Sequence, residues 1–221
     1  MAVDQTWKGV YKSGGFSLLA GGIILIVFLL SVFIFRVDLP LTPQAVLENP
    51  VPPVTLYLAA ALGELLLIPA ALGLYLSLKD VNKNYMLIAA ASWFVAVTMY
   101  LVSRGQIMSL LPLSRSYMPI SSDFTRTTYL VSAEQTIEVA NIYGNIALML
   151  HQVGTIIIGL VMLKGVYGRR IGYLVTIAGS MAFIGTFGIV LRPLALFTLF
   201  GLMLTGVWQI IVGIKLYKLG L

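Results

Sequence analysis

Six apolar runs limit the fold of this chain more than any other feature of its sequence. Each run holds roughly twenty residues, the length at which an α-helix crosses the hydrocarbon core of a bilayer. The sequence therefore predicts an all-α polytopic membrane protein, a single bundle of six transmembrane helices formed by residues 1–221. The predicted spans are residues 14–35, 54–78, 85–103, 137–163, 171–191 and 194–216.

The composition agrees with a membrane protein and excludes several other classes. The chain is 59% hydrophobic and 10% charged, whereas soluble domains carry about 25% charged residues. It has no Cys, which excludes disulfides, thiolate nucleophiles and Cys-based metal sites. The first apolar run exceeds the core of a signal peptide and is not followed by a small-residue cleavage site, so we expect it to remain as a span.

The basic residues are distributed unequally between the two ends of the spans. One side collects nine of them, including every Lys, and the other side five Arg. Because basic residues are enriched on the cytoplasmic side, both termini are predicted to lie in the cytoplasm of a multi-pass cell-membrane protein. Basic residues at span ends also indicate lipid headgroups as partners rather than nucleic acid. The nine are Lys8, Lys12, Lys79, Lys83, Lys164, Arg169, Arg170, Lys215 and Lys218, and the five are Arg36, Arg104, Arg115, Arg126 and Arg192.

Two connecting segments have distinct compositions. Residues 37–53 hold five Pro, which predicts an extended connector. Residues 104–136 form the most polar stretch and are predicted to be an extracytoplasmic loop, partly helical from Ser122. Within it, Ser132-x-x-Gln135 has the spacing of a capping box and is expected to start or restart the long helix that follows.

Several segments resemble a known family. They are IPAALGLYLSLK at the end of the second span, TTYLVSAEQTIEVAN before the fourth, and VWQIIVGIKLYK at the C-terminus with Trp208, Gly213 and Leu216. In these segments and in its overall pattern the chain is similar to the DUF4386 family of small integral membrane proteins. The resemblance implies the same membrane fold and brings no activity with it.

A polar stripe runs along the helix predicted from Ser132 onward. At 100° per residue, Glu134, Glu138, Asn141, Asn145 and Gln152 fall on one face. Polar side chains inside a bilayer face other helices or a wet cavity. The side-chain amides of Asn141, Asn145 and Gln152 could line a cavity that opens outward, or could join helices by hydrogen bonds. The two Glu are explained equally well by the positive end of a helix dipole.

Glu64 is the strongest single candidate for a functional group. It lies about ten residues into its span, hence about 15 Å deep, and Pro69 is expected to kink the same helix. A carboxyl at this depth either binds a proton or cation, or is a neutral acid bonded to a neighbouring helix. His151 lies at a similar depth and is the partner that the sequence suggests for Glu64. It also has a plain alternative, a neutral imidazole bonded across a helix interface.

Three arginines are candidates for the outer mouth of a cavity. Arg36, Arg104 and Arg192 each end an odd-numbered span on the outer side. Anchoring at the membrane interface explains them, and together they could also hold an anionic group. Glycine pairs inside the spans indicate close helix contacts rather than phosphate loops.

These observations favour a protein that binds or transports a small molecule or ion at Glu64, Asn141, Asn145, His151 and Gln152. No catalytic set, metal site or cofactor motif is present at a fixed spacing, so no cofactor is expected and an enzyme is not favoured. One alternative is an accessory subunit of a membrane complex, or a homo-oligomer, in which the polar groups only join helices. Another is an intramembrane enzyme that acts on a lipid.

Overall fold

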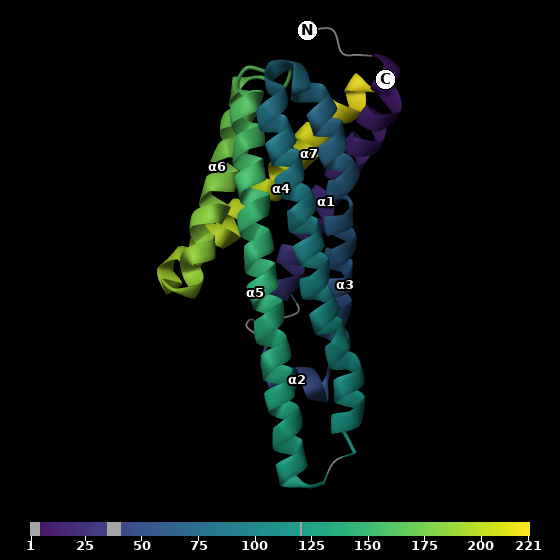
Figure 1. Ribbon diagram of the computed structural model, residues 1–221, viewed down its shortest axis with the longest axis vertical. Coiled ribbons are helices and arrows are strands. Elements are labelled where there is room, and N and C mark those ends of the chain that lie inside the picture. Colours follow the sequence, from purple (N-terminus) through teal and green to yellow (C-terminus); the bar gives the residue numbers. More distant parts are fainter. Residues whose placement is uncertain (1–4, 35–40, 120) are drawn as a thin grey trace.

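A computed structural model describes residues 5–34, 41–119 and 121–221, and in these ranges all regular structure is helical. The long helices lie side by side, and the start of α1 and the end of α7 lie at the same end of the bundle (Figure 1). The helices are α1 (Lys8–Ile34), α2 (Pro43–Glu48), α3 (Val51–Leu65), α4 (Leu67–Tyr117), α5 (Asp123–Met162), α6 (Arg169–Gly185) and α7 (Ala195–Leu219), with 3-10 turns η1 (Gln5–Trp7), η2 (Thr186–Ile189) and η3 (Arg192–Leu194).

Five helical stretches in the described ranges are long and apolar enough to cross a membrane. One of them, Val51–Tyr117, is 67 residues long and turns back on itself at Asn82, whose φ of −159° and ψ of 95° are not helical. The Asn82 side-chain oxygen accepts a hydrogen bond from the Tyr85 backbone N–H at 3.1 Å, which caps the returning half of α4. Figure 1 shows the two halves of α4 running in opposite directions.

The helix predicted to kink at Pro69 is interrupted shortly before that residue. α3 ends at Leu65 and α4 begins at Leu67, with a turn between them. Proline has no N–H to donate to the carbonyl four residues earlier, which here belongs to Leu65, and its ring crowds that carbonyl. The interruption at Leu66 therefore falls three residues before the proline and two residues after Glu64.

The connector predicted to be extended is partly helical. α2 lies within it and α3 already starts at Val51, so the extended prediction is wrong for residues 43–48 and 51–53. Thr42 caps α2, and Pro43 occupies its first position, where the missing N–H has no helical partner to lose. Residues 37–40 lie outside the described part of the chain.

The polar segment 104–136 is also more helical than predicted. α4 continues to Tyr117 and α5 begins at Asp123, which confirms a helix from that region but leaves only a short turn between the two. The prediction that Ser132 starts or restarts a helix is wrong, because Ser132 lies inside α5, where its hydroxyl donates to the Thr128 carbonyl. With 40 residues, α5 is about 60 Å long, roughly twice the thickness of a bilayer core.

The far end of the α4–α5 hairpin has a hydrophobic core of its own. α2 lies across the hairpin, and the Ser114 hydroxyl donates to the Leu47 carbonyl at 2.5 Å. Buried side chains from the three helices pack together there: Val46, Leu47, Ile107, Leu110, Tyr117, Ala133, Ile137 and Ala140. This core holds the hairpin together beyond the other helices.

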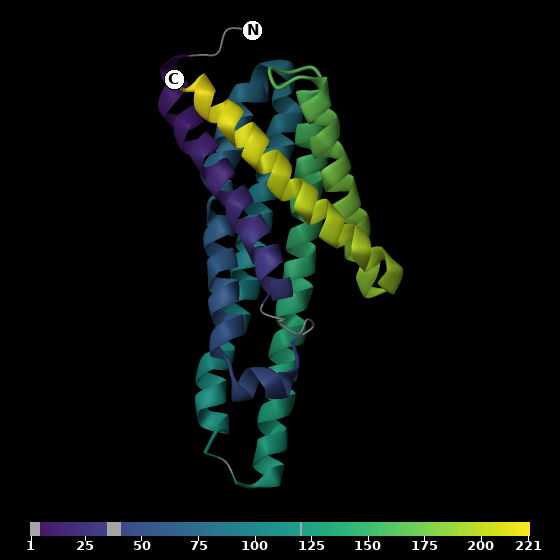
Figure 2. The same cartoon turned by 180° about the vertical axis from the view of Figure 1, so that it is seen from behind.

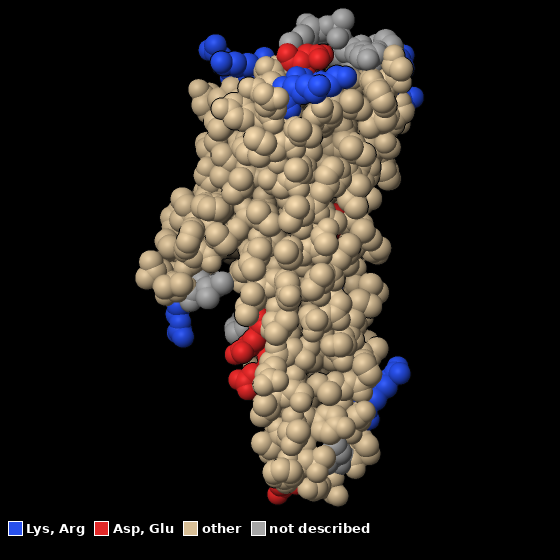
Figure 3. Space-filling model, viewed as in Figure 1, with Lys and Arg blue, Asp and Glu red and all other residues tan. Residues whose placement is uncertain are grey.

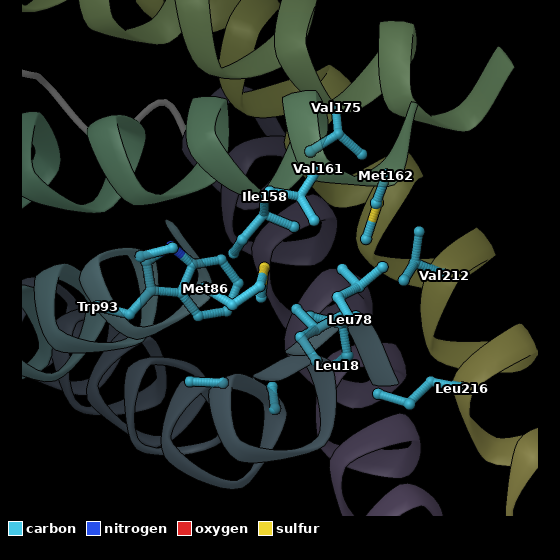
Figure 4. Packing of buried hydrophobic residues seen from close by; sticks show 14 of the residues in the cluster. Leu18, Leu78, Met86, Trp93, Ile158, Val161, Met162, Val175, Val212 and Leu216 are labelled. Carbon is cyan, nitrogen blue, oxygen red and sulfur yellow. The ribbon is translucent and has the colours of Figure 1, made fainter. Parts of the chain in front are cut away.

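The main core lies at the opposite end, where α1, α4, α5 and α7 meet (Figure 4). α7 crosses the bundle diagonally (Figure 2) and packs on α1 through its C-terminal half and on α6 through its N-terminal half. Glycine allows both approaches: a Cβ on Gly15 would lie 2.3 Å from the Tyr217 nitrogen, and one on Gly201 would lie 2.3 Å from the Ala182 nitrogen. Because α7 packs against α1 and α6, α1 and α5 do not pack closely against each other.

In Figure 3 charged side chains lie at the upper end of the molecule and across its lower half, and a broad band between these two regions is almost free of charge. This band is the surface that a bilayer would cover. Gly168, with φ of 87°, precedes the first residue of α6 and contacts no other helix in the described ranges. Gly172, one turn into α6, packs against Gly159 of α5 and against Leu163, which follows α5.

Candidate functional site

A cavity of about 270 Å³ lies where α1 and α5 stay apart. Five helices contribute to its wall: α1, α3, α4, α5 and α7. The side chains from α1 are apolar, and most polar ones come from α3, α4 and α5. The polar lining residues are Tyr57, Glu64, Tyr100, Ser103, Arg104, Asn141, Asn145, His151 and Gln209.

Glu64 and Arg104 form an ion pair in this wall. The Arg104 Nη2 atom donates to one Glu64 carboxylate oxygen at 2.5 Å, and its Nε lies 3.2 and 3.3 Å from the two oxygens. The side chains are only 15% (Arg104) and 12% (Glu64) exposed. The pair joins the last turn of α3 to the returning half of α4, and it offsets the cost of placing either charge among the helices.

Two tyrosines complete the surroundings of the guanidinium. The Arg104 carbon Cζ lies 5.0 Å from the Tyr57 ring centroid and 5.6 Å from that of Tyr100. Both distances are within the range of cation–π attraction. Arg104 is therefore held by one carboxylate and two aromatic faces, which fixes its position in the wall.

α5 supplies the opposite part of the polar wall. The Asn145 amide nitrogen donates to the Asn141 carbonyl at 2.8 Å, one turn earlier in the same helix, which leaves its amide oxygen without a partner in the described chain. The Ser103 hydroxyl donates to the Ala140 carbonyl at 2.8 Å and ties α4 to α5. From α7, Gln209 reaches the cavity while being only 2% exposed, and it bonds to no other described residue.

His151 lines the cavity, but it is not the partner of Glu64. The sequence prediction placed the two residues in contact or bridged by a water, and both line the same cavity, but the direct partner of the Glu64 carboxylate is Arg104. The imidazole instead packs edge-on against Trp93, with ring centroids 4.9 Å apart, and lies 6.3 Å from Tyr100. The Nε2 atom of His151 has no hydrogen-bond partner in the described chain.

The polar stripe of α5 divides among three environments. Glu134 and Glu138 are exposed, Asn141 and Asn145 line the cavity, and Gln152 is fully buried outside it. Both polar atoms of Gln152 lack a partner in the described chain. One face of so long a helix meets different neighbours at different heights, so a shared helical face did not mean a shared site.

The three outer arginines do not gather at one mouth. Arg104 belongs to the cavity wall, Arg192 is exposed at the start of η3 and does not line the cavity, and Arg36 lies outside the described residues. The sequence interpretation missed Tyr57, Tyr100 and Gln209. A polar Gln209 deep in an apolar span was a signal that it could have used.

The arrangement provides hydrogen-bonding groups and a paired charge inside an apolar shell. In the described part of the chain no three His, Asp or Glu side chains come close enough to hold a metal ion. The wall can accept and donate hydrogen bonds through tyrosine, asparagine and glutamine. Such a cavity is suited to holding a molecule in a fixed orientation.

Comparison with known proteins gives one match. The family model described as "Domain of unknown function (DUF4386)" matches residues 14–219. Neither a curated protein nor a solved structure matches the chain.

Proposed function

Since the chain belongs to the DUF4386 family, whose model covers nearly its whole length, and since it is a membrane-embedded helical protein, we propose that it binds a small molecule in the cavity between its helices. The observation that carries the proposal is the cavity of about 270 Å³ with Glu64 and Arg104 in its wall. The cavity is partly open to the surroundings, where its lining residue Asn141 is exposed, and an apolar pocket with a few polar groups in its wall is the usual form of a small-molecule site.

The proposal includes six crossings of the membrane. The stretch Val51–Tyr117 would cross twice, because it reverses at Asn82 and each arm is long enough to span. Both termini would then lie on the side that carries every Lys, which the positive-inside rule assigns to the cytoplasm. The cell membrane is the membrane we propose. The end of the α4–α5 hairpin would project outside.

Transport is the second candidate, and one observation favours it. The turn at Leu66, between α3 and α4, lies two residues after Glu64. Broken helices beside polar groups near the middle of a membrane are typical of transporter sites, because the break lets the two halves move separately. In this version the Glu64–Arg104 pair would open and reform as the molecule passes.

The proposal is tested by filling the cavity. Ala60 lines it and its neighbour Ala59 is exposed on the outer face of α3. We expect native mass spectrometry of the purified protein to detect a co-purifying small molecule in the parent and in Ala59→Phe. Ala60→Phe should lose it.

The two variants carry the same added ring, so general effects of phenylalanine cancel between them. Retention of the molecule by Ala60→Phe at the level of Ala59→Phe would place it outside the cavity and overturn the proposal. Complete absence of any bound molecule from freshly extracted parent protein would do the same.

A further inference from the structure

The cavity has a polar half and an apolar half, and they face different parts of the bundle. The apolar half is the wall made by α1, with Ile24, Leu25 and Phe28. The other face of α1 exposes Ile23, Val27 and Leu30 to the surroundings. The apolar half therefore lies on a helix whose other face is exposed, and the polar half lies on α3, α4, α5 and α7.

The cavity carries no net charge. Glu64 and Arg104 are the charged residues among those that line it, and each neutralises the other. A charged ligand would bring an ion into an apolar region without a counter-ion, which is strongly unfavourable. The ligand that fits this wall is electrically neutral.

The remaining polar groups both donate and accept hydrogen bonds. Gln209 has a complete amide with no bond to another described residue, and Asn145 retains a free amide oxygen. A hydroxyl group can donate to one amide and accept from another, so it matches this wall better than a pure acceptor or a pure donor. The wall thus favours a head that carries hydroxyl groups.

We infer that the cavity takes an uncharged amphiphile from the bilayer, with a hydroxyl-bearing head against α5 and α7 and an apolar tail along α1. This inference rests on the proposed function and narrows it to one class of ligand. The Glu64–Arg104 pair acts in it as the determinant of specificity: with both residues present the site prefers neutral heads.

Three probes with the same oleoyl or oleyl chain test the charge preference. They are monooleoylglycerol, which is neutral and has two hydroxyls, oleate, which is anionic, and oleylamine, which is cationic. The delipidated protein is incubated with an equimolar mixture, and bound probes are counted by native mass spectrometry. Only binding that Ala60→Phe removes and Ala59→Phe keeps is assigned to the cavity. We expect that binding to be dominated by monooleoylglycerol.

Substitutions in the ion pair should then shift the preference in opposite directions. Glu64→Gln leaves the Arg104 charge unpaired, and it should raise the ratio of bound oleate to monooleoylglycerol by at least about tenfold. A tenfold change corresponds to about 1.4 kcal/mol, and a hydrogen bond between the oleate carboxylate and the unpaired Arg104 is expected to supply at least that much. Arg104→Gln should raise the share of oleylamine instead. Glu48→Gln, which alters the exposed pair with Arg126 outside the cavity, should leave the parent preference unchanged.

The outcomes separate this inference from the proposed function. Dominant binding of oleate or oleylamine in the parent, still abolished by Ala60→Phe, overturns the neutral amphiphile and leaves the cavity as a binding site. An unchanged preference in folded Glu64→Gln and Arg104→Gln overturns the role of the ion pair in specificity and, with it, the inference. Binding that is equal in Ala60→Phe and Ala59→Phe overturns both proposals. Elution as a single sharp peak in gel filtration identifies the variants that are folded.

Discussion

At the scale of single residues, the pairing of Glu64 with Arg104 decides what each can do. An isolated charge near the middle of a membrane costs about 2.5 to 3.5 kcal/mol on insertion scales. Each member of the pair lowers that cost for the other, and the two tyrosine rings add cation–π attraction to Arg104. The intact pair therefore adds little to the free energy of unfolding. Leaving either residue without its partner would lower that free energy by more than the pair adds.

Removing one partner should therefore destabilise the protein more than removing both. We expect Glu64→Leu to lower the free energy of unfolding by roughly 3 kcal/mol, and Glu64→Leu with Arg104→Leu to recover most of that loss. Unfolding by SDS titration in mixed micelles measures both. Glu48→Leu is the matched control at the exposed ion pair and should change little. A double variant less stable than Glu64→Leu would contradict the pairing.

Gln152 and Gln209 make a second comparison at this scale, because one lies outside the cavity and the other lines it. An unpartnered buried amide is unfavourable, so Gln152→Met should raise the free energy of unfolding by about 1 kcal/mol and leave ligand retention unchanged. Gln209→Met should reduce retention of the co-purifying molecule. Destabilisation by Gln152→Met would show that its amide has a partner, such as a buried water.

At the scale of the elements, the diagonal course of α7 creates the cavity. α7 packs on α1 at one end and on α6 at the other, so it cannot also close the space between α1 and α5. Both approaches depend on glycine, because a side chain there would meet the backbone of the neighbouring helix. In membranes, small residues allow the close packing that replaces the hydrophobic driving force between helices.

A methyl group at Gly15 should separate α1 from α7. Its Cβ would lie 2.3 Å from the Tyr217 nitrogen, so Gly15→Ala should cost about 1 to 3 kcal/mol. Gly105, in the middle of α4, has nothing within 4 Å of an added Cβ, and Gly105→Ala should be neutral or stabilising by up to about 1 kcal/mol. Thermal unfolding in detergent compares the two. Equal effects would contradict the close contact of α1 with α7.

At the scale of the whole molecule, the helices have two different lengths. α1, α6 and α7 match the thickness of a bilayer, whereas α5 and the returning half of α4 continue well beyond them (Figures 1 and 2). The additional parts of α4 and α5 pack against α2 and form a separate hydrophobic core with it. The hairpin therefore forms a stalk on the side of the molecule opposite the two termini.

The absence of native Cys allows a direct test of this topology. Met118→Cys lies at the end of the hairpin, Lys83→Cys at the reversal of α4, and Val95→Cys on an exposed face between them. With a membrane-impermeant thiol reagent on intact cells, we expect labelling of Met118→Cys alone. Lys83→Cys should react only after the cells are opened, and Val95→Cys, covered by lipid, in neither case. Labelling of Lys83→Cys in intact cells without Met118→Cys would invert the topology.

The membrane class, the helical runs and the break near Pro69 follow from the sequence, because they depend on local properties. The length of an apolar run sets whether it can span a bilayer, and a proline disrupts its own helix wherever that helix lies. The weak helical signal of the polar stretch 104–136 and of the connector before α3 misled the prediction. There, packing between α2, α4 and α5 stabilises helices that composition alone does not favour.

The partner of Glu64 and the existence of the cavity depended on the tertiary structure. Arg104 follows Glu64 by 40 positions, and the two meet only because α4 reverses at Asn82 and places its returning half beside α3. His151, at a similar predicted depth, lines the same cavity, but its imidazole packs against Trp93. Depth can be estimated by counting residues along one helix, but which side chains meet at a given depth depends on how each helix is rotated and offset against its neighbours.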